Sequence, residues 1–540
     1  MHPTKKPAII ITKRLGGRRK FPPFDNFRPV IMNLKFEQVT PESVGCSSQA
    51  LLNFLQNVQN ANHEMHSFIL LKDGKIICEK YWQPFAAQYR HQLFSLSKSF
   101  TSTAIGMAVD EKLLTTSTLL ADIFADEFTQ LAERVNDKIR KMTIKNLLTM
   151  STGMEYETWS MAAETDNITA FLSGHFKDNP GETFRYSSIA TYMLSAAITR
   201  LTGKTLTEYL APRLFEPLGI TDYYWSIDPQ TGVELGGFGL NLTTPDIAKF
   251  GQFLLQKGNW NGKQLVSADW IEEATSKQIS NASGDESADK NNDWAQGYGY
   301  QFWRCKPAGV YRGDGMYGQY CVVVPAENIV IAATSNADMG KVLNLFWQLL
   351  DDLKTAEKLP NSSAALAEYD NLTHLIAEKS DKYPNYAAGY KIVSPKPTNP
   401  ENTAYLAFDF RGGECILETY NLRGYENNLD RTVAAFLFQQ DKWLKYAAPH
   451  ITSEQRLRHE KINRVATYGT WDEKNRTFTM TTWFYESATK DQFRAIFSED
   501  YSKMTIEKRG GGFDSQFAEI CKAEKTITKI NERKTGGQND

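Results

Sequence analysis

Alternating hydrophobic and polar residues mark two hairpins that lie far apart along the chain. Residues 67–82 (SFILLKDGKIICEKYW) contain two β-rich runs joined at Asp73 and Gly74, a dipeptide that tolerates the positive φ angles of a tight turn. Residues 321–336 (CVVVPAENIVIAATSN) have the same form. We expect both hairpins to join one antiparallel sheet, built from the two ends of this segment.

Between the hairpins, the hydrophobic period changes from that of a strand to that of a helix. Helical patterns cover four segments there, and a fifth follows the second hairpin: residues 94–113, 143–150, 189–201, 245–256 and 342–353. In the fourth segment, Thr244 is the expected N-cap and Pro245 the first helical residue. The pattern predicts an α+β fold, in which an antiparallel sheet is flanked by helices and carries a largely helical subdomain.

Residues 355–366 (TAEKLPNSSAAL) have the Pro, Ser and Asn content of a linker. Strand-like runs recur beyond it, namely AYLAFDF, CILETYNL, RVATYGTW, RTFTMTTWF and FRAIFS, and they predict a small C-terminal antiparallel β domain. We therefore divide the chain into a basic, disordered tail (1–36), a main domain (37–354), the linker, a β-rich accessory domain (367–525) and a polar tail (526–540).

Charge and composition exclude some partners. The chain has 540 residues, 41% of them hydrophobic, and a formal net charge of -2, so it presents no basic field for nucleic acid or an anionic membrane. The first 31 residues hold eight basic side chains against Asp25 alone. No run approaches the ~18 apolar residues of a membrane-spanning helix. A small-molecule substrate without strong charge fits this composition best.

Cysteine usage and the N-terminal segment bear on localisation. No secretory signal pattern follows Met1 or Met32, and either methionine fits as the start of the protein. The six cysteines show no CxxC pair that would indicate metal or redox chemistry, so we expect free thiols and a cytoplasmic protein. They are Cys46, Cys78, Cys305, Cys321, Cys415 and Cys521.

The candidate chemistry begins in the stretch LFSLSKSF, where Ser95 and Lys98 form an SxxK pair. Positions three apart share one face of a helix, so the lysine amine reaches the serine hydroxyl. A serine is a weak nucleophile until a neighbouring base takes its proton, and burial makes a lysine such a base by lowering its pKa. The start of a helix also offers unpaired backbone N–H groups to a developing oxyanion.

Two other serines show the same spacing, and two more lie beside Ser95. Ser287 and Lys290 stand in a charged, solvated loop, whereas Ser487 and Lys490 follow a C-terminal strand. Only Ser95 begins a segment that is small and apolar on nearly every side, as a buried helix requires. Ser97 and Ser99 lie on other faces of that helix, and we expect them to pack or to bond the backbone.

Several blocks resemble, in order, the serine β-lactamase and penicillin-binding superfamily. They include LFSLSKSFTSTAIGMAVDEKLL, MTIKNLLTMSTGM, GETFRYSSIATYMLSAAITRLTGKTLTEYL, GFGLNLTTPDIAKFG and GDGMYGQYCVVVP. The resemblance covers about residues 38–353 and is to the class C β-lactamase-like hydrolases, the branch with family VIII carboxylesterases and 6-aminohexanoate-oligomer hydrolases. It implies a β-lactamase-like main domain.

The resemblance also implies residue roles. Ser95 would be the acylated nucleophile, Lys98 its base, and Tyr186 the residue that relays protons to and from the leaving group. We expect the nearby lysine cation to lower the pKa of Tyr186. The family usually shows Tyr-x-Asn here, whereas this chain has Ser188 in the third position, which can still hydrogen-bond Lys98.

At the third family motif, this chain departs further from the family pattern. Where β-lactamases and DD-peptidases have Lys-Thr-Gly, this chain has Gly313, Asp314 and Gly315. Arg312 should point away from the cleft if residue 313 points into it, so a clamp for a substrate carboxylate is in doubt. The glycines would let the strand backbone approach the substrate. By analogy, the N–H of Met316 joins that of Ser95 in an oxyanion hole.

Other candidate residues give weaker evidence for a functional role. Asn241 and the aromatic residues of YYW (223–225) and YGYQFW (298–303) would line the pocket or belong to the core. His63 and His66 are one residue too close for an HExxH zinc site, which indicates a surface histidine pair. Gly203 of GKT reads as the end of a helix rather than part of a phosphate loop. We expect no metal and no cofactor.

The sequence thus predicts a serine hydrolase that cleaves a small ester or amide through an acyl-enzyme at Ser95. One alternative is a DD-peptidase or β-lactamase. Another is a binding or sensor protein that keeps the fold without turnover, which the departures at Ser188 and Gly313 would suit. The natural substrate, the role of the accessory domain and the oligomeric state stay open.

Overall fold

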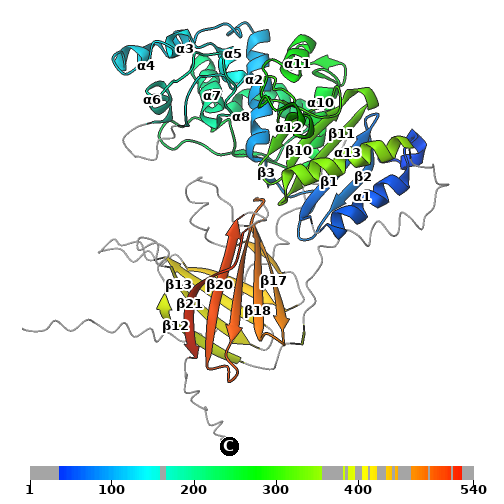
Figure 1. The fold of residues 1–540 in the computed structure, drawn as a ribbon, viewed down its shortest axis with the longest axis vertical. Coiled ribbons are helices and arrows are strands. Elements are labelled where there is room, and N and C mark those ends of the chain that lie inside the picture. The colour runs from blue at the N-terminus through cyan, green and yellow to red at the C-terminus, as the bar shows by residue number, and fades with distance from the viewer. Residues whose placement is uncertain are drawn as a thin grey trace, which may run out of the picture.

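The computed structural model describes residues 36–61, 63–157, 166–355, 381–382, 387–395, 404–411, 414–421, 433–440, 444–447, 464–484, 487–511 and 515–525. The expected tails up to residue 35 and from residue 526 lie outside the described residues, as does the predicted linker from residue 356 on. The α+β class is confirmed: Figure 1 shows a mixed layer of helices and strands, and a separate sheet formed by the C-terminal part of the chain.

The α-helices are α1 (Ser48–Asn60), α2 (Ser97–Asp110), α3 (Leu120–Ile123), α4 (Ala125–Gln130), α5 (Ile144–Leu148), α6 (Asn167–Leu172), α7 (Ser188–Thr202), α8 (Leu206–Leu210), α9 (Glu216–Leu218), α10 (Thr244–Leu255), α11 (Ala268–Thr275), α12 (Glu286–Asn291) and α13 (Met339–Thr355). Shorter turns of 3-10 helix are η2 (Pro41–Val44), η3 (Phe94–Leu96), η4 (Ile139–Lys141) and η6 (Pro325–Glu327), and η5 (Ala211–Phe215) is a π-helical turn.

The strands of the main domain are β1 (Met65–Lys72), β2 (Lys75–Tyr81), β3 (His91–Gln92), β4 (Tyr224–Trp225), β5 (Leu240–Leu242), β6 (Asn259–Trp260), β7 (Lys263–Gln264), β8 (Trp303–Arg304), β9 (Tyr311–Gly315), β10 (Gln319–Val324) and β11 (Ile329–Ser335). Those of the C-terminal sheet are β12 (Ala387–Pro395), β13 (Ala404–Arg411), β14 (Glu414–Asn421), β15 (Val433–Gln439), β16 (Leu444–Ala447), β17 (Arg464–Asp472), β18 (Thr477–Phe484), β19 (Lys490–Phe497), β20 (Lys503–Gly511) and β21 (Ala518–Lys525).

Both predicted hairpins belong to one antiparallel sheet with strand order β2-β1-β11-β10-β9-β8. β1 pairs with β11, which brings Ile69 opposite Ala332 although the two residues are far apart in sequence. Asp73 and Asn328 have φ angles of 51° and 50° in the two turns. The tolerance of these residue types for left-handed backbone explains why each chain reversal falls there.

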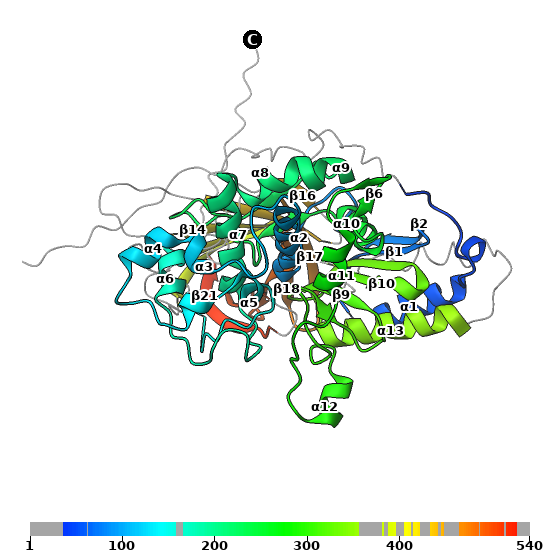
Figure 2. The ribbon, with the colours of Figure 1, turned by 90° about the horizontal axis from the view of Figure 1, so that it is seen from above.

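Alternating side chains of this sheet pack on two different helical layers. Leu70 and Ile331 join a core with α1 and α13, whereas Ile69 and Ala332 face the larger core that contains α2 and α10. Figure 2 shows α13 and α1 along one side of the sheet and α2 and α10 on the other. The sheet is therefore buried on both faces, as its continuous apolar strands require.

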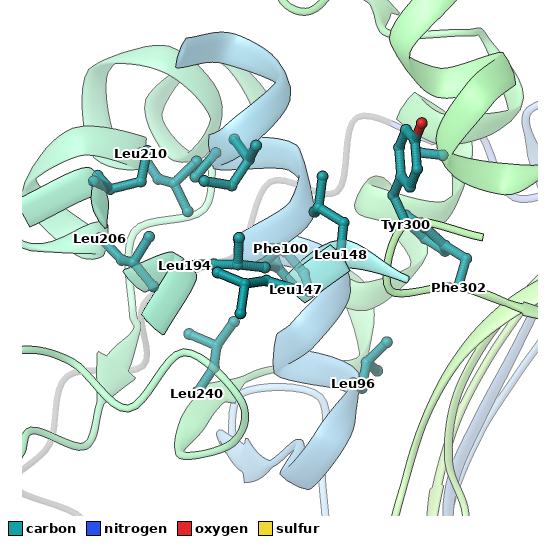
Figure 3. Packing of buried hydrophobic residues seen from close by; sticks show 14 of the residues in the cluster. Leu96, Phe100, Leu147, Leu148, Leu194, Leu206, Leu210, Leu240, Tyr300 and Phe302 are labelled. Atoms are coloured by element: carbon teal, nitrogen blue, oxygen red, sulfur yellow. The ribbon is translucent and has the colours of Figure 1, made fainter. Parts of the chain in front are cut away.

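α2 is the central helix of the main domain. Figure 3 shows it between leucines of the helical layer, such as Leu194, and the ring of Phe302. Residues 97–108 of α2 are all buried, including its serines and threonines, and most of their hydroxyls bond backbone oxygens: Thr103 donates to Ser99 O at 2.9 Å. A helix buried all round provides a rigid support for whatever stands at its N-terminus.

The helical segments form near their predicted positions, with one correction. The N-cap of α10 is Thr243, whose hydroxyl accepts from the backbone N–H of Asp246, and Thr244 is the first helical residue. The expectation that Thr244 caps this helix is therefore wrong by one position. Gly203 closes α7 with a φ of 68°, which confirms a helix C-terminus rather than a phosphate loop.

The C-terminal sheet is larger than predicted. Its ten strands follow the order β15-β14-β13-β12-β21-β20-β19-β18-β17-β16, and β15 also contacts β16 and β17, so the sheet curls until its two edges meet. The five strand-like runs correspond to β13, β14, β17, β18 and β19. Trp471, Phe478, Met480 and Phe493 lie in its core.

Two properties of the described residues bear on the expected partners. Over those ranges, none of the helices is both long and apolar enough to pass through a bilayer. Over the same ranges, no group of three or more His, Cys, Asp and Glu side chains could hold a metal ion. The five cysteines whose side chains are described, which leaves out Cys521, are buried and take part in no disulfide bond.

Candidate active site

Ser95 stands in the 3-10 turn η3, between strand β3 and helix α2. It is half-buried, whereas Phe94 before it and Leu96 after it are buried. The N–H of Leu93 donates to Leu240 O at 2.8 Å, which anchors the approach to the turn on β5. The Ser95 side chain is thus held at the surface of a rigid, buried element.

Lys98 reaches Ser95 from one turn further along. Its Nζ lies 3.2 Å from Ser95 Oγ, 3.0 Å from Ser188 Oγ and 2.7 Å from Gly237 O. Lys98 is only 1% exposed, and this burial lowers its pKa to about 7, although the negative charges of Glu157 and Asp314 act in the opposite direction. A lysine with such a pKa is about half neutral at pH 7, and its neutral amine can accept a proton.

Tyr186 completes the group on the other side of Ser95. Its hydroxyl hydrogen-bonds the Ser95 side chain, and its ring lies 4.8 Å from Lys98 Nζ. Although Tyr186 is 37% exposed, its packed surroundings raise the pKa of the hydroxyl above the ordinary range, and the charge of Asp314 adds to this. The expectation of a lowered pKa is therefore wrong, and Tyr186 is a neutral phenol.

The backbone around Tyr186 is fixed from both sides. The N–H of Arg185 donates to Met150 O at 2.7 Å, and Ser187 caps helix α7 by accepting from the N–H of Ala190 at 3.3 Å. The ring itself stacks on Trp303, with centroids 5.3 Å apart, and meets Tyr298 edge-on. Tyr186 therefore stands on an aromatic wall that restricts its motion.

Ser188 and Gly237 supply the other two partners of Lys98. Ser188 is the first residue of α7, and a Cβ on Gly237 would lie 2.7 Å from Ser188 O. Only a glycine lets these two segments approach so closely. Glu157 accepts from the N–H of Ser188, so a carboxylate occupies the positive end of this helix, where the dipole favours it.

The glycines of β9 approach the chain segment around Ser95 rather than open space. A Cβ on Gly315 would lie 2.0 Å from Leu93 O, and one on Gly313 would lie 2.5 Å from Leu96 Cδ1 and from Ser99 Oγ. The two glycines thus let β9 pack on the turn that carries Ser95. This is a different reason for glycine from the close approach to substrate that we expected.

Arg312 and Asp314 lie on the opposite face of β9 from Gly313. Arg312 Nε is 2.9 Å from Asp314 Oδ2, and Trp294 Nε1 donates to the same oxygen at 3.0 Å. Both members of the pair are buried, Arg312 completely. Because its charge is matched by Asp314, Arg312 is not available as a clamp for a substrate carboxylate.

Met316 follows β9 directly, in the turn to β10. Its side chain is 53% exposed, and Tyr317 after it has a φ of 66°. The ring of Tyr317 meets that of Phe94 edge-on, with centroids 5.5 Å apart, and Phe94 has a φ of 47°. This contact places the backbone of Met316 beside the turn of Ser95.

Asn241 lies on β5, between β3 and β4. It is 3% exposed, and its side-chain amide donates to Gly239 O at 3.0 Å, so the structure places it inside the small sheet rather than on an open surface. Of the aromatic candidates, Tyr298 and Trp303 are buried but contact Tyr186. They belong both to the core and to the wall of the site.

The competing serines lie elsewhere. Ser97 Oγ donates to Phe94 O at 2.6 Å, and Ser99 Oγ donates to Gln301 O at 3.0 Å, so both bond the backbone as expected. Ser287 is exposed in the short helix α12, and Ser487 is in the C-terminal sheet domain, 5% exposed. Within the described residues, Ser95 is the SxxK serine that joins a lysine, a tyrosine and a second serine.

Sequence reasoning missed two contributors to this site. Gly237 acts through its carbonyl, which leaves no side-chain signal, although the glycine-rich GGFGL stretch was a hint that backbone is exposed to a neighbour there. Glu157 stands in a polar stretch without periodicity. Its place at the start of α7 depends on contacts between residues about thirty positions apart.

The main domain is similar in sequence to known proteins. The sequence model of the family described as Beta-lactamase matches residues 58–348. A 6-aminohexanoate-dimer hydrolase of Paenarthrobacter ureafaciens is 25% identical over 289 residues, which are 50% of this chain and 72% of that protein.

Two solved structures show lower identity. A family VIII carboxylesterase has 16% identity and a TM-score of 0.45, covering 59% of this chain and 98% of its own. An octameric penicillin-binding protein homologue from Pyrococcus abyssi has 14% identity and a TM-score of 0.45, covering 88% of this chain and 99% of its own.

Proposed function

The chain belongs to the beta-lactamase family of serine hydrolases and penicillin-binding proteins, and on this premise we propose that it cleaves a small ester or amide through an acyl-enzyme at Ser95. The observation that carries the proposal is the position of Lys98. Its amine is buried, its pKa is lowered to about 7, and it lies 3.2 Å from Ser95 Oγ. This is the arrangement that makes a serine hydroxyl nucleophilic.

The three partners of Lys98 fit both of its protonation states. A neutral amine has two N–H donors and one lone pair: the donors bond Gly237 O and Ser188 Oγ, and the lone pair receives the Ser95 proton. After the transfer, the ammonium has three donors for the same three oxygens. Proton transfer then needs no rearrangement of the site, which lowers the cost of reaching the transition state.

Tyr186 is proposed as the acid for the leaving group. As Ser95 Oγ attacks the carbonyl carbon, its proton passes to Lys98, and the tetrahedral intermediate collapses when the leaving oxygen or nitrogen receives a proton. The Tyr186 phenol, which hydrogen-bonds Ser95, would donate this proton. The resulting phenolate is a stronger base than the Lys98 amine, so it would recover a proton from the Lys98 ammonium. Water then attacks the acyl-enzyme with the roles reversed.

The oxyanion would be held by the backbone N–H groups of Ser95 and Met316. The packing of Gly315 against Leu93 O and the contact of Phe94 with Tyr317 support this assignment, because they hold the two segments together. Loss of one such donor typically costs ~10²-fold to 10³-fold in rate.

The charges around the site favour a substrate without a carboxylate. The charged groups that act on the pKa of Lys98 are the acidic residues Glu157 and Asp314. Arg312 forms an ion pair with Asp314. β-Lactams and cell-wall peptides carry a carboxylate that a cationic triplet would hold, so simple esters and amides suit this site better. The related 6-aminohexanoate-dimer hydrolase supports amide chemistry in the family.

The test is covalent labelling with a fluorophosphonate, followed by intact-protein mass, alongside hydrolysis of p-nitrophenyl acetate and butyrate. Wild type and Ser287→Ala, which alters the exposed SxxK serine, should each gain one adduct and hydrolyse both esters, whereas Ser95→Ala should do neither. An unlabelled wild type would overturn the proposal and favour a sensor protein. Faster turnover of a β-lactam than of both esters would overturn the substrate class and favour a β-lactamase.

A further inference from the structure

Two short motifs that the proposed chemistry does not use meet each other in the structure. Glu64 and His66 belong to the HEMH stretch of residues 63–66, and Lys490 belongs to the SxxK sequence that begins at Ser487. Lys490 Nζ is 2.7 Å from Glu64 Oε1, and the two side chains are only 22% and 16% exposed. A half-buried ion pair thus joins the start of β1 in the main domain to the start of β19 in the C-terminal sheet.

Trp483 lies beside this ion pair and faces away from its own domain. Phe478, Met480 and Phe484 of β18 point into the core of the C-terminal sheet, so the alternation of a strand directs Trp483 outward. It is nevertheless 2% exposed. An outward tryptophan is buried only if another part of the molecule covers it.

The cover comes from the main domain. The ring of Trp483 meets His66 edge-on at 5.0 Å and Phe85 at 5.4 Å between centroids. Phe85 and Trp483 form a separate buried cluster with Ala466. Ala466, Trp483 and Lys490 are direct cross-strand neighbours on β17, β18 and β19, so they form one row on the C-terminal sheet; we call these three residues the docking row.

On the main-domain side, Trp483 of the docking row contacts His66, one of a pair of buried histidines. His66 Nδ1 lies 2.9 Å from His91 Nε2, and His91 Nδ1 lies 3.0 Å from Gln92 O. A carbonyl only accepts, so His91 Nδ1 carries the hydrogen, and in the neutral ring its Nε2 accepts from His66 Nδ1. Burial lowers the pKa of both histidines. His66 is fully buried, so the expectation of a surface histidine pair is wrong for this residue.

This histidine pair is linked to Ser95 through the backbone of β3. His91 is the first residue of β3, four positions before Ser95, and it pairs with Leu242 of β5. The bond from His91 Nδ1 to Gln92 O and the bond from Leu93 N to Leu240 O fix the strand just before the turn η3. Displacement of His66 would therefore free one of the contacts that hold β3 in place.

We propose that Trp483 and Lys490 are positioning residues for the reaction at Ser95, acting from the C-terminal domain through His66 and His91 on strand β3. The proposal rests on the proposed function. In it, the C-terminal domain affects catalysis although it does not contact the substrate. Catalysis depends on the position of the nucleophile to a fraction of an ångström, so loosening of β3 should reduce kcat more than it affects substrate binding.

The experiment compares p-nitrophenyl butyrate kinetics and fluorophosphonate labelling rates in full-length variants. Trp483→Ala should lower kcat by about tenfold while KM changes by less than about twofold, and Trp483→Phe, which keeps an aromatic edge, should recover most of the loss. Thr479→Ala is the matched control, since Thr479 lies on the same outward face of β18, four residues before Trp483. It should behave as wild type.

A charge exchange tests the ion pair without removing a large side chain. Lys490→Glu places two carboxylates together and should lower kcat, and the double variant Glu64→Lys with Lys490→Glu should have a higher kcat than Lys490→Glu alone. Hydrogen exchange of the peptides covering residues 83–97 provides a readout independent of turnover. Exchange should rise in Trp483→Ala and stay unchanged in Thr479→Ala.

The outcomes separate this inference from the proposed function. If wild type is labelled at Ser95 but Trp483→Ala keeps the wild-type kcat and the same exchange over residues 83–97, the positioning role is wrong and the proposed function stands. If wild type is not labelled at all, the proposed function fails, and the exchange measurement alone still decides whether the docking row holds β3.

Discussion

Phe94 and Tyr317 both have left-handed backbone, with φ angles of 47° and 66°, and their rings meet edge-on at 5.5 Å. One residue precedes Ser95 and the other follows Met316, so the contact spans the two segments proposed to form the oxyanion hole. Aromatic residues rarely adopt this backbone conformation, and strain of this kind persists where the surrounding structure holds it in place.

The first prediction concerns this contact. Tyr317→Ala removes the ring and should lower kcat on p-nitrophenyl butyrate by about tenfold or more, because one oxyanion donor loses its support. Tyr317→Phe keeps the ring and should stay within about threefold of wild type. Steady-state kinetics of both variants check it, and equal losses in the two would show that the hydroxyl rather than the ring contact matters.

The second prediction is a pH profile set by Lys98. Since its pKa is lowered to about 7 and only the neutral amine accepts the Ser95 proton, kcat/KM should fall as the pH drops below about 7. The raised pKa of Tyr186 predicts no second decline up to pH ~10. Lys98→Arg should lose about 10³-fold or more, because a guanidinium stays charged. A profile without a limb near pH 7 would exclude Lys98 as the base.

The third prediction concerns Ser188, which stands where the family usually has asparagine. Its hydroxyl bonds Lys98 Nζ at 3.0 Å and favours the ammonium, so Ser188→Ala should lower the pKa of Lys98 and move the acid limb of the profile to lower pH. We expect kcat to fall by about tenfold. Ser188→Asn restores an acceptor and should keep the wild-type limb. A limb that moves to higher pH in Ser188→Ala would contradict this arrangement.

The fourth prediction tests the packing of β9 on the nucleophile turn. A Cβ on Gly315 would lie 2.0 Å from the backbone oxygen of Leu93, so Gly315→Ala should lower the free energy of unfolding by about 2 kcal/mol or more and kcat by about 10²-fold. Gly340→Ala is the control, because its Cβ would meet nothing closer than 3.5 Å. Denaturant unfolding and ester hydrolysis measure both effects.

The fifth prediction concerns stability away from the site. Glu234 is 6% exposed, and burial raises its pKa to about 7 from 4.5, against bonds from Thr207. The stabilisation contributed by the neutral carboxyl is complete below pH 4.5 and is lost as the pH rises through 7. Glu234→Gln should therefore gain about 1–3 kcal/mol over wild type at pH 8 and little at pH 5. Urea unfolding at both pH values decides it.

Local signals determined much of the fold. The hairpin turns at Asp73 and Asn328 are set by residues that tolerate left-handed backbone, and α2, α7 and α10 follow from hydrophobic periodicity. The SxxK pair is also local, because Ser95 and Lys98 are three residues apart on one helical stretch. The N-cap of α10 was misplaced by one residue, since Thr243 and Thr244 are the same residue type.

Only the tertiary structure decided the environment of each group. The pKa of Tyr186 rises because burial and Asp314 act on it together, and the third partner of Lys98 is a carbonyl 139 residues away. Likewise, His66 is fully buried and contacts the ring of Trp483, which comes from the C-terminal sheet. A sequence pattern records what a residue is and what its near neighbours are, whereas desolvation and charge depend on residues that are brought close only when the chain folds.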